Sequence, residues 1–250
     1  MEKDRIARER EFHNEIFSQK TREVTNKFYS IFYLIEEKYV AKLTAKCSGK
    51  KILEYGCGEG SSAYLLAQNG GIVTGIDISD FAILQAQQKA DTMKLSIEFT
   101  NMNAEELAFP DKFFDLICGS GIIHHLDIKK AYSEISRVLK NEGKAIFMEP
   151  LGHNFLINWY RKKTPSLRTE DEHPLLKSDL KLLTDYFEHT QIKFFFFSSL
   201  VAIFFRKTFI FKPMLRTFHA FDRLLFWLMP FLRWQAWFVL IEFSVPKKAQ

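Results

Sequence analysis

Short apolar runs alternate with amphipathic segments through the middle of the chain. The apolar runs are bounded by turn-forming residues and predict buried β-strands at 51–55, 72–76, 96–99, 114–118 and 144–148. The segments between them repeat apolar residues every three or four positions and predict helices at 61–68, 80–91 and 128–139. Strands and helices that alternate in this way predict an α/β fold, in which a parallel sheet carries helices on both faces.

The region before the first strand has a helical pattern. Phe12 and Ile16, and later Phe28 and Phe32, recur at four-residue spacing with charged residues between them. We expect a pair of helices over residues 5–45 that leads into the sheet and forms a lid beside it.

The regular alternation stops after Pro150. We expect a turn at 141–143, an ordered loop at 151–174, a helix at 178–186, a strand at 192–197, an apolar helical segment broken at Pro213 and Pro230, and a last strand at 237–243. These limits divide the chain into an N-terminal helical lid (1–48), a cofactor-binding core (49–199) that includes a substrate loop (149–174), an apolar helical insertion (200–233), and a final core strand with a tail (234–250).

Composition and charge narrow the class of protein. The 47% apolar fraction is ample for a core, and three cysteines are too few for a disulfide framework or a zinc site. The start of the chain is charged and lacks an apolar leader, so we expect a cytoplasmic protein without a bound metal. Residues 192–250 hold nine Lys and Arg against two Asp and Glu, a net +7, together with 14 of the 26 Phe. This basic, aromatic region suits an anionic surface, an apolar ligand or a partner subunit better than nucleic acid.

A glycine-rich turn directly follows the first predicted strand. Gly56, Gly58 and Gly60 allow the backbone to approach a ligand closely, and the next helix would aim its free N–H groups at the same place. Asp77 ends the second strand about 20 residues later, where its carboxylate can hold ribose hydroxyls. These features alone are compatible with either a dinucleotide or S-adenosylmethionine.

Three further features favour S-adenosylmethionine. Glu54 precedes the glycines and can meet a cationic amino group, whereas it would repel a pyrophosphate. Asn103, Ala104 and Glu105 follow the third strand as an adenine-contacting turn, and small residues Ser120 and Gly121 end the fourth. Cys57 within the turn and Ile78 after Asp77 complete the predicted cofactor site.

Residues 50–149 resemble class I S-adenosylmethionine-dependent methyltransferases, in the broad group that includes the ubiquinone- and menaquinone-pathway enzymes. The stretches that carry the resemblance are Ile52–Gly60, Gly75–Ser79, Phe109–Asp115, His124–Leu126 and Ile135–Lys140. The resemblance implies a Rossmann-like seven-stranded sheet in the order 3-2-1-4-5-7-6 with the last strand antiparallel, and S-adenosylmethionine as cofactor. Asn103 stands where the group usually has Asp, and the lost charge predicts weaker cofactor binding.

The residues that would perform the chemistry are less defined. A phenol, carboxylate or amine acceptor can need a base, and histidine suits that role near neutral pH. We take His124 in the His124–His125 pair and, in the long loop, His153 and His173 as candidate catalytic residues, with loop packing as the alternative. Candidate substrate contacts are Tyr29, Tyr33, Glu149, Asn154 and Arg168, although core packing is the alternative for the two tyrosines.

The apolar insertion at 200–233 admits three interpretations. It can cover a greasy substrate pocket, lie in a membrane interface through 200–237, or form a homodimer interface. None of its apolar runs reaches the length of about 20 residues that a membrane span needs. The first two interpretations share an acceptor that is apolar or lipid-like.

The sequence therefore predicts a methyltransferase that acts on a small, hydrophobic or lipid-like acceptor and does not bind nucleic acid. Two alternatives stay open: a nicotinamide-dependent oxidoreductase, and a catalytically silent protein of the same fold. The acceptor, the O, N or C atom that is methylated, the use of a base and the oligomeric state are left open by the sequence.

Overall fold

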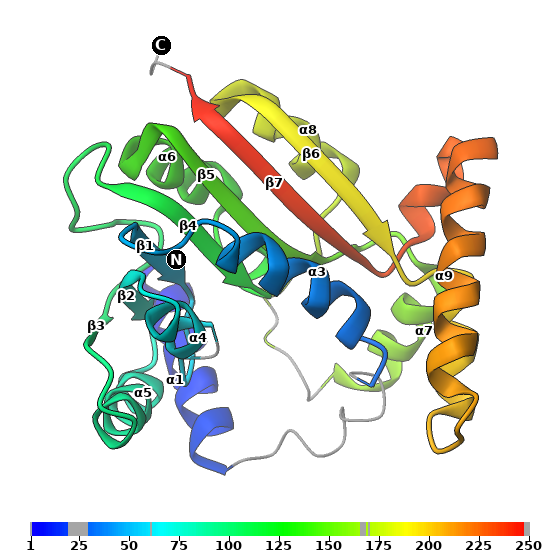
Figure 1. Cartoon of the computed structure of the whole chain (residues 1–250), viewed down its shortest axis with the longest axis horizontal. Coiled ribbons are helices and arrows are strands. Elements are labelled where there is room, and N and C mark those ends of the chain that lie inside the picture. The colour runs from blue at the N-terminus through cyan, green and yellow to red at the C-terminus, as the bar shows by residue number, and fades with distance from the viewer. Residues whose placement is uncertain (1, 20–29, 61, 166–168, 170, 248–250) are drawn as a thin grey trace.

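The computed structural model describes residues 2–19, 30–60, 62–165, 169 and 171–247. Its centre is a seven-stranded sheet in the order β3-β2-β1-β4-β5-β7-β6 (Figure 1). The strands are β1 (Lys51–Tyr55), β2 (Ile72–Asp77), β3 (Ile97–Asn101), β4 (Phe114–Ser120), β5 (Leu139–Pro150), β6 (Phe187–Phe195) and β7 (Phe238–Pro246). Neighbouring strands pair in parallel except β7, which is antiparallel to both β5 and β6. The predicted fold class and strand order are confirmed.

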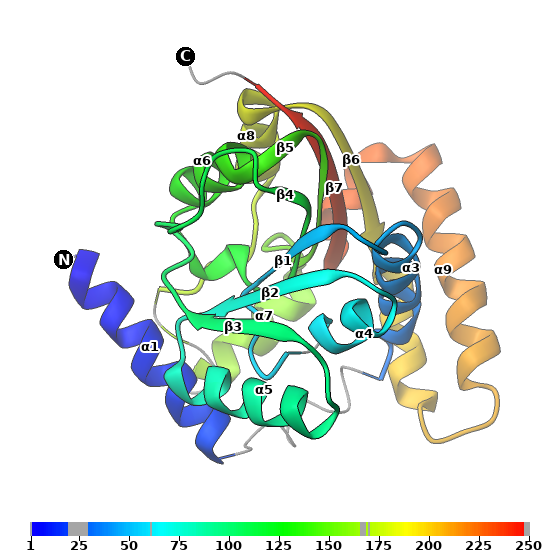
Figure 2. The same cartoon turned by 60° about the vertical axis from the view of Figure 1, so that its left-hand side comes forward.

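Helices cover both faces of this sheet (Figures 1 and 2). The described helices of the central region are α3 (Tyr33–Thr44), α4 (Ala63–Gln68), α5 (Asp80–Thr92), the 3₁₀ helix η2 (Ile123–His125), α6 (Ile128–Val138) and α8 (Lys177–Tyr186). The helix α1 (Glu2–Gln19) lies beside α5 at one end of the sheet. The helix α7 (Phe155–Lys163) follows β5.

Each strand contributes to two cores because its side chains point alternately to opposite faces. In β1, Leu53 and Tyr55 pack in the cluster that includes α6 and α8, whereas Ile52 packs in the cluster that includes α3 and α4. All three side chains are fully buried. Burial on both faces explains why these strands appear in the sequence as continuous apolar runs.

The strand order reverses between β1 and β4. From β1 the chain moves outward to β2 and β3, and then returns to β4 on the other side of β1. The loops that follow β1 and β4 therefore diverge, and the carboxyl ends of these strands border a crevice where ligands bind in such sheets. The glycine turn and the Ser120–Gly121 turn both lie at this crevice.

Three local predictions were wrong. The expected turn at 141–143 lies inside β5. Phe114 of β4 pairs with Leu139 and Leu116 pairs with Lys144, so the register between β4 and β5 shifts there and β5 holds the extra residues as an irregularity. The expected loop 151–174 contains α7, in which Ile157 is buried but Phe155, Leu156 and Trp159 are exposed, so that no core-facing periodicity marks the helix in the sequence. The strand expected at 192–197 runs from Phe187 to Phe195, because an alternating edge-strand pattern extends it backwards.

The segment expected as an apolar insertion forms three helices at the β6 edge of the sheet. They are the 3₁₀ helix η4 (Ser198–Phe205), α9 (Phe211–Leu228) and the 3₁₀ helix η5 (Pro230–Gln235). Pro213 does not break α9, since it lies in the first turn, where backbone N–H groups have no partner within the helix. Among the described residues no helix combines the length and the apolar character needed to cross a bilayer.

A buried carboxylate attaches α9 to η4. Asp222 is completely buried, and its oxygens accept hydrogen bonds from the backbone N–H groups of Phe197, Ser198 and Ser199. The hydroxyl groups of both serines also donate to it, at 2.5 and 2.7 Å. Asp222 thus supplies the acceptors that the first turn of η4 lacks.

We expect Asp222→Ala to lower the free energy of unfolding by about 3 kcal/mol, because it leaves buried N–H groups without acceptors. Asp222→Asn should lower it less, since its amide oxygen still accepts. Urea denaturation followed by circular dichroism measures both. Equal stability of Asp222→Ala and wild type would contradict this role of the carboxylate.

Candidate active site

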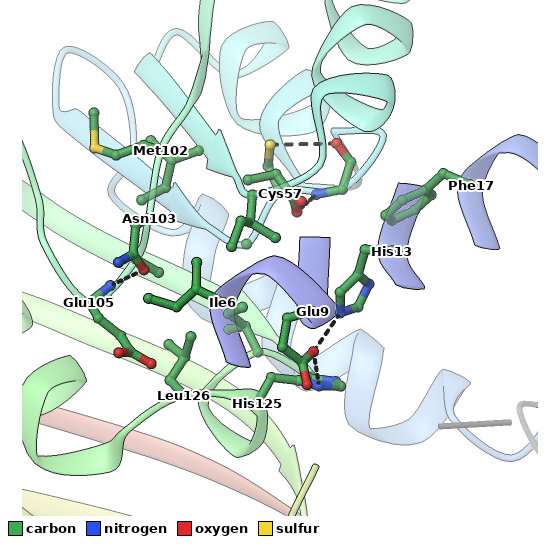
Figure 3. Close-up of a pocket in the computed structure, with 18 of the residues that line it drawn as sticks. Ile6, Glu9, His13, Phe17, Cys57, Met102, Asn103, Glu105, His125 and Leu126 are labelled. Carbon is green, nitrogen blue, oxygen red and sulfur yellow. Dashed lines mark hydrogen bonds and ion pairs between the residues drawn. The ribbon is translucent and has the colours of Figure 1, made fainter. Parts of the chain in front are cut away.

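A cavity of about 490 Å³ opens at the carboxyl ends of β1, β2 and β4 and is covered by α1 (Figure 3). Its size falls in the usual range for small-molecule sites, about 300–1,000 Å³. The predicted residues that line it are Gly56, Cys57, Gly58, Asp77, Ile78, Asn103, Ala104, Glu105, Ser120 and Gly121. Thus most of the predicted cofactor residues, which come from four separate loops, meet at one cavity.

The glycine turn requires residues without a side chain. Gly56, Gly58 and Gly60 all have positive φ angles, which L-residues rarely adopt. A Cβ atom at Gly56 would lie 2.6 Å from Ile122, and one at Gly60 would lie 2.7 Å from Tyr64. Gly60 does not line the cavity, so its function in the described structure is to let the turn close.

Two carboxylates accept hydrogen bonds from backbone N–H groups in and beside this turn. Asp77 accepts the Gly58 N–H at 2.7 Å with one oxygen and the Ser79 N–H at 2.9 Å with the other. Glu54 is buried and accepts the N–H groups of Ser62 and Ala63 at 2.7 and 2.9 Å. Asp77 faces the cavity, whereas Glu54 lies outside its lining and caps the start of α4.

The turn after β3 is tied to the rest of the site. Asn103 accepts the Glu105 N–H at 3.0 Å, and the Tyr55 hydroxyl donates to the Ala104 carbonyl. Glu105 is buried and accepts the Asp127 N–H as well as an ion pair from Arg5 at 2.5 Å. These bonds fix the turn against β1 and against the loop that precedes α6.

The helix α1 covers the cavity and is held there by hydrogen bonds at two points along its length. Near its start, Arg5 bonds to Glu105 and to the His125 carbonyl. Further along, Asn14 accepts the Ser79 hydroxyl at 2.5 Å. Arg8 forms an ion pair with Asp171 at 2.8 Å and so joins α1 to the long loop after α7.

The covering helix places a carboxylate between two imidazoles at the cavity wall. Glu9 Oε2 lies 3.2 Å from His125 Nδ1 and 3.5 Å from His13 Nε2, and Glu9 Oε1 accepts the Thr169 hydroxyl at 2.5 Å. Burial alone would raise the pKa of Glu9, but the contacts with His125, His13 and Thr169 outweigh it and hold the pKa well below its usual value. Glu9 is therefore a carboxylate that lies within ion-pair distance of both rings.

Figure 3 shows this cluster on one side of the cavity, with Met102 and Asn103 on the other. One ligand atom from each of Glu9, His13 and His125 lies within 4.8 Å of the others, which is also close enough for a cation. The cluster can thus accept a proton or, alternatively, bind a metal ion. A second such group joins His124, His125 and Glu172.

His124 and Glu149 form a buried pair that does not line the cavity. His124 Nδ1 lies 2.8 Å from Glu149 Oε2, while Glu149 Oε1 accepts the N–H groups of Ile122 and Ile123 at 3.0 Å each. Burial raises the pKa of Glu149 to about 7, although these backbone bonds act in the opposite direction. Burial also lowers the pKa of His124 well below its usual value. The pair fixes η2, whose neighbour Ile122 and terminal His125 do line the cavity.

The other predicted catalytic and substrate residues lie outside the lining formed by the described residues. His153 Nε2 accepts the Lys177 N–H, and exposed His173 donates its own N–H to the His124 carbonyl. Asn154 caps α7 and bonds to the Gln235 carbonyl, and the Tyr33 hydroxyl donates to the Lys212 carbonyl. Tyr29 and Arg168 lie outside the described residues.

The predictions from sequence missed the contribution of α1 and the orientation of the histidine pair. Arg5, Glu9, His13 and His125 line the cavity, whereas His124 does not. The four-residue spacing of Glu9 and His13 was a usable signal, since it places both on one face of a helix. None of residues 200–233 lines this cavity. The cavity therefore gives no support to the interpretation that they cover the substrate.

Comparison with known proteins agrees with this arrangement. Residues 53–147 match the family of methyltransferase domains. The ubiquinone biosynthesis O-methyltransferase of Alkalilimnicola ehrlichii is 34% identical over 111 residues, 44% of this chain and 45% of that protein. An S-adenosyl-L-methionine-dependent Diels-Alderase of Talaromyces variabilis is 32% identical over 154 residues, 60% and 49% of the two chains. This chain thus spans about half the length of the curated relatives it matches.

A solved structure extends the likeness of fold beyond the matched domain. Magnesium protoporphyrin IX methyltransferase from Synechocystis PCC 6803, crystallised with bound SAH, has a TM-score of 0.62 to this chain at 18% identity. The match covers 96% of this chain and 99% of that one. At such low identity the likeness concerns the fold alone.

We expect Glu149→Ala to lower the free energy of unfolding by about 3 kcal/mol, because two buried N–H groups and His124 lose their partner. Glu149→Gln should cost less, since the amide oxygen accepts the N–H groups and the amide nitrogen can donate to His124. Urea denaturation at neutral pH distinguishes the two. Similar losses for both variants would contradict this assignment.

The same pair predicts a pH dependence. The folded-state pKa of Glu149, about 7, is above its usual value of 4.5, so its contribution to stability is fully present below pH 4.5 and is lost as the pH rises through about 7. Glu149→Gln lacks this term and should gain up to about 3 kcal/mol relative to wild type across that window. A constant difference in the free energy of unfolding between the two proteins from pH 4.5 to 8 would exclude it.

Proposed function

We propose that this chain is a class I S-adenosylmethionine-dependent methyltransferase, which binds S-adenosylmethionine in the cavity and methylates a small acceptor there. The match of residues 53–147 to the methyltransferase-domain family and the strand order of the sheet support this proposal. The observation that carries the proposal is the division of the cavity. Asp77 and the Asn103 turn lie on the nucleoside side, and the Glu9–His13–His125 cluster lies on the other. A nucleoside and a reacting group can therefore be held at opposite ends of one cavity.

The residues present fit the nucleoside. Each oxygen of Asp77 accepts one backbone N–H and keeps a second lone pair, so that both can still accept ribose hydroxyls. Asn103 offers amide groups at the edge of the cavity, while Met102, Ala104 and Ile78 give it apolar walls suited to a flat ring. A Cβ atom at Gly56 would lie 2.6 Å from Ile122 and one at Gly58 would lie 3.2 Å from Phe17, so the two glycines let the turn lie close to these side chains of the cavity wall.

Glu54 supports this cofactor over a dinucleotide. A pyrophosphate binds where the first N–H groups of a helix are free. Here the N–H groups of Ser62 and Ala63 already donate to the buried Glu54 carboxylate, which also adds a negative charge behind the turn. A pyrophosphate at this point would meet the repulsion of Glu54 and would find these two N–H groups already engaged.

The cluster at the far side suits an acceptor that must lose a proton. S-adenosylmethionine supplies an electrophilic methyl carbon on a sulfonium group. His13 or His125 can take the proton from an O–H or N–H group, and the adjacent Glu9 carboxylate stabilises the imidazolium that forms. Ile6, Phe17 and Leu126 line the same cavity and favour an acceptor with an apolar body.

The closed position of α1 contributes to catalysis through exclusion of water. Arg5 and Asn14 fix the helix over the cavity, so the reacting groups are held in one orientation. His124 and Glu149 act as positioning residues in this scheme, because they hold the turn that carries His125. An acid–base role for the Glu9–His13–His125 cluster requires no direct part for His153 or His173.

We expect the chain to bind S-adenosylhomocysteine and Asp77→Ala to weaken that binding at least tenfold, since the ribose loses its acceptor. Asp77→Asn keeps an oxygen for the Gly58 N–H and serves as the matched control for the shape of the turn, with an intermediate affinity. Isothermal titration calorimetry gives the three affinities. Unchanged binding in Asp77→Ala would place the ribose elsewhere.

The same titration with NADH tests the alternative cofactor. Binding of NADH without S-adenosylhomocysteine would overturn the proposed function. Binding of S-adenosylhomocysteine with no methyl transfer to any phenol, carboxylate or amine in a screen with methyl-labelled cofactor would instead favour the catalytically silent alternative.

We expect Glu9→Gln and His125→Gln to lower kcat by about a hundredfold or more on an acceptor found in that screen, because general-base catalysis contributes that much. Affinity for S-adenosylhomocysteine should change only a few-fold, which separates a catalytic effect from misfolding. Parallel assays with a chelator, and with added divalent cations, distinguish a proton acceptor from a metal site. Full activity of both variants would remove the cluster from the mechanism.

A further inference from the structure

The helix α9 presents an apolar face to the solvent as well as to the protein. Leu215 and Phe226 on its inner side are buried against η4 and its surroundings. On the outer side, Phe221, Leu224 and Trp227 are exposed, with Trp227 at 74%. We call Phe221, Leu224, Trp227 and the adjacent exposed Leu228 the outer face of α9. Their spacing of three and four residues places them along one side of the helix.

Exposed aromatic residues continue beyond the ends of this helix. Phe204 in η4 and Phe209 in the turn before α9 are 83% and 95% exposed, and Phe231 in η5 is 68% exposed. Single exposed apolar residues need no explanation, but a cluster of this size marks an interaction site. The helix α9 lies at the β6 edge of the molecule, away from α1 (Figures 1 and 2).

The exposed charges of the segment that carries the outer face, residues 196–237, have one sign. Residues 196–237 contain six Lys and Arg and a single acidic residue, Asp222. Asp222 is completely buried and bonded to the first turn of η4, so it offers no negative charge at the surface. Lys212, Arg216 and Arg223 are exposed and, at spacings of four and seven residues, form a cationic stripe along one flank of α9.

We propose that the outer face of α9 docks on an anionic lipid bilayer. Apolar side chains would enter the boundary between headgroups and acyl chains, and the cationic stripe would meet the anionic headgroups with its aliphatic stems along the apolar surface. In this arrangement α9 would lie in the plane of the interface, with its apolar outer face toward the acyl chains. This surface is separate from the cavity, so the proposal does not depend on the proposed function.

Charge also argues against a second copy of the chain as the occupant. A two-fold dimer pairs a surface with itself. Two outer faces would bring cationic stripes together, and residues 196–237 have no exposed carboxylate to neutralise them. Like charges that face each other across an interface oppose association. An anionic membrane supplies the missing charge and the apolar layer together.

Flotation of the full chain with vesicles tests the proposal. We expect the protein to float with vesicles of phosphatidylcholine and phosphatidylglycerol in equal parts at low salt, and much less with phosphatidylcholine alone. High salt should release part of the protein, since it screens the cationic stripe. Failure to float with anionic vesicles at low salt would overturn the proposal, as would equal binding to both kinds of vesicle.

Two sets of variants separate the contribution of the cationic stripe to membrane binding from that of the apolar side chains. Lys212→Glu, Arg216→Glu and Arg223→Glu together should weaken the partition roughly a hundredfold, because each cation near an anionic surface contributes about a fivefold factor. Their matched control is Lys46→Glu, Lys129→Glu and Lys181→Glu, which changes the net charge equally at exposed positions elsewhere. Leu224→Ser should weaken it about tenfold, and Leu84→Ser, at a similarly exposed leucine on α5, should not.

Circular dichroism spectra and urea denaturation must match wild type in each variant, so that a loss of flotation reports the surface and not the fold. An equal loss of flotation in the control triple variant would show that the net charge of the protein, and not the stripe on α9, determines binding. That result would overturn the assignment to α9. Light scattering in the absence of lipid measures whether a second copy of the chain binds at this face instead. A dimer that Leu224→Ser dissociates would identify a second copy at this face and would also overturn the proposal.

Discussion

The loops at the carboxyl edge of the sheet depend on carboxylates that accept their backbone N–H groups. Glu54 at β1, Asp77 at β2 and Glu149 at β5 each accept two such groups from the loop or turn beside them. A buried N–H group without an acceptor costs about 1–3 kcal/mol, so the conformations of these loops are determined by the positions of three side chains. Because those side chains are on strands, the sheet dictates the shape of the cavity.

This constraint gives each carboxylate a different relation to ligand binding. Asp77 reaches the cavity and keeps lone pairs for a ligand, whereas Glu54 and Glu149 lie behind the surface and act through the turns that they hold. Burial raises the pKa of Glu149 to about 7, so this carboxyl group, which holds the N–H groups before His124, titrates near neutral pH. The nucleoside side of the cavity is built on the ends of strands, and the opposite side also depends on α1.

The sequence predicted the features that depend on residues close together along the chain, and missed those that depend on contacts between distant residues. The strands, Asp77 and the glycine turn were predictable, since period, length and turn chemistry are local properties. The strand order came from resemblance, because the local pattern of residues leaves the order open. The sequence named His124, whereas His125 lines the cavity, because the orientation of the pair depends on Glu149 and Glu9, which are distant in sequence. Likewise, α7 places several apolar residues in solvent, so a pattern based on burial assigned this helix to a loop.

The position of the transferred methyl group relative to the Glu9–His13–His125 cluster tests the proposed mechanism most directly. Nuclear Overhauser effects can be recorded from S-adenosylmethionine labelled with ¹³C on its methyl group and bound to the full chain. We expect contacts from this methyl group to the ring protons of His13 or His125, with the ribose protons near Asp77 and Ile78. Contacts only to side chains outside the cavity lined by α1, or none to either imidazole, would contradict the placement of the reaction at this cluster.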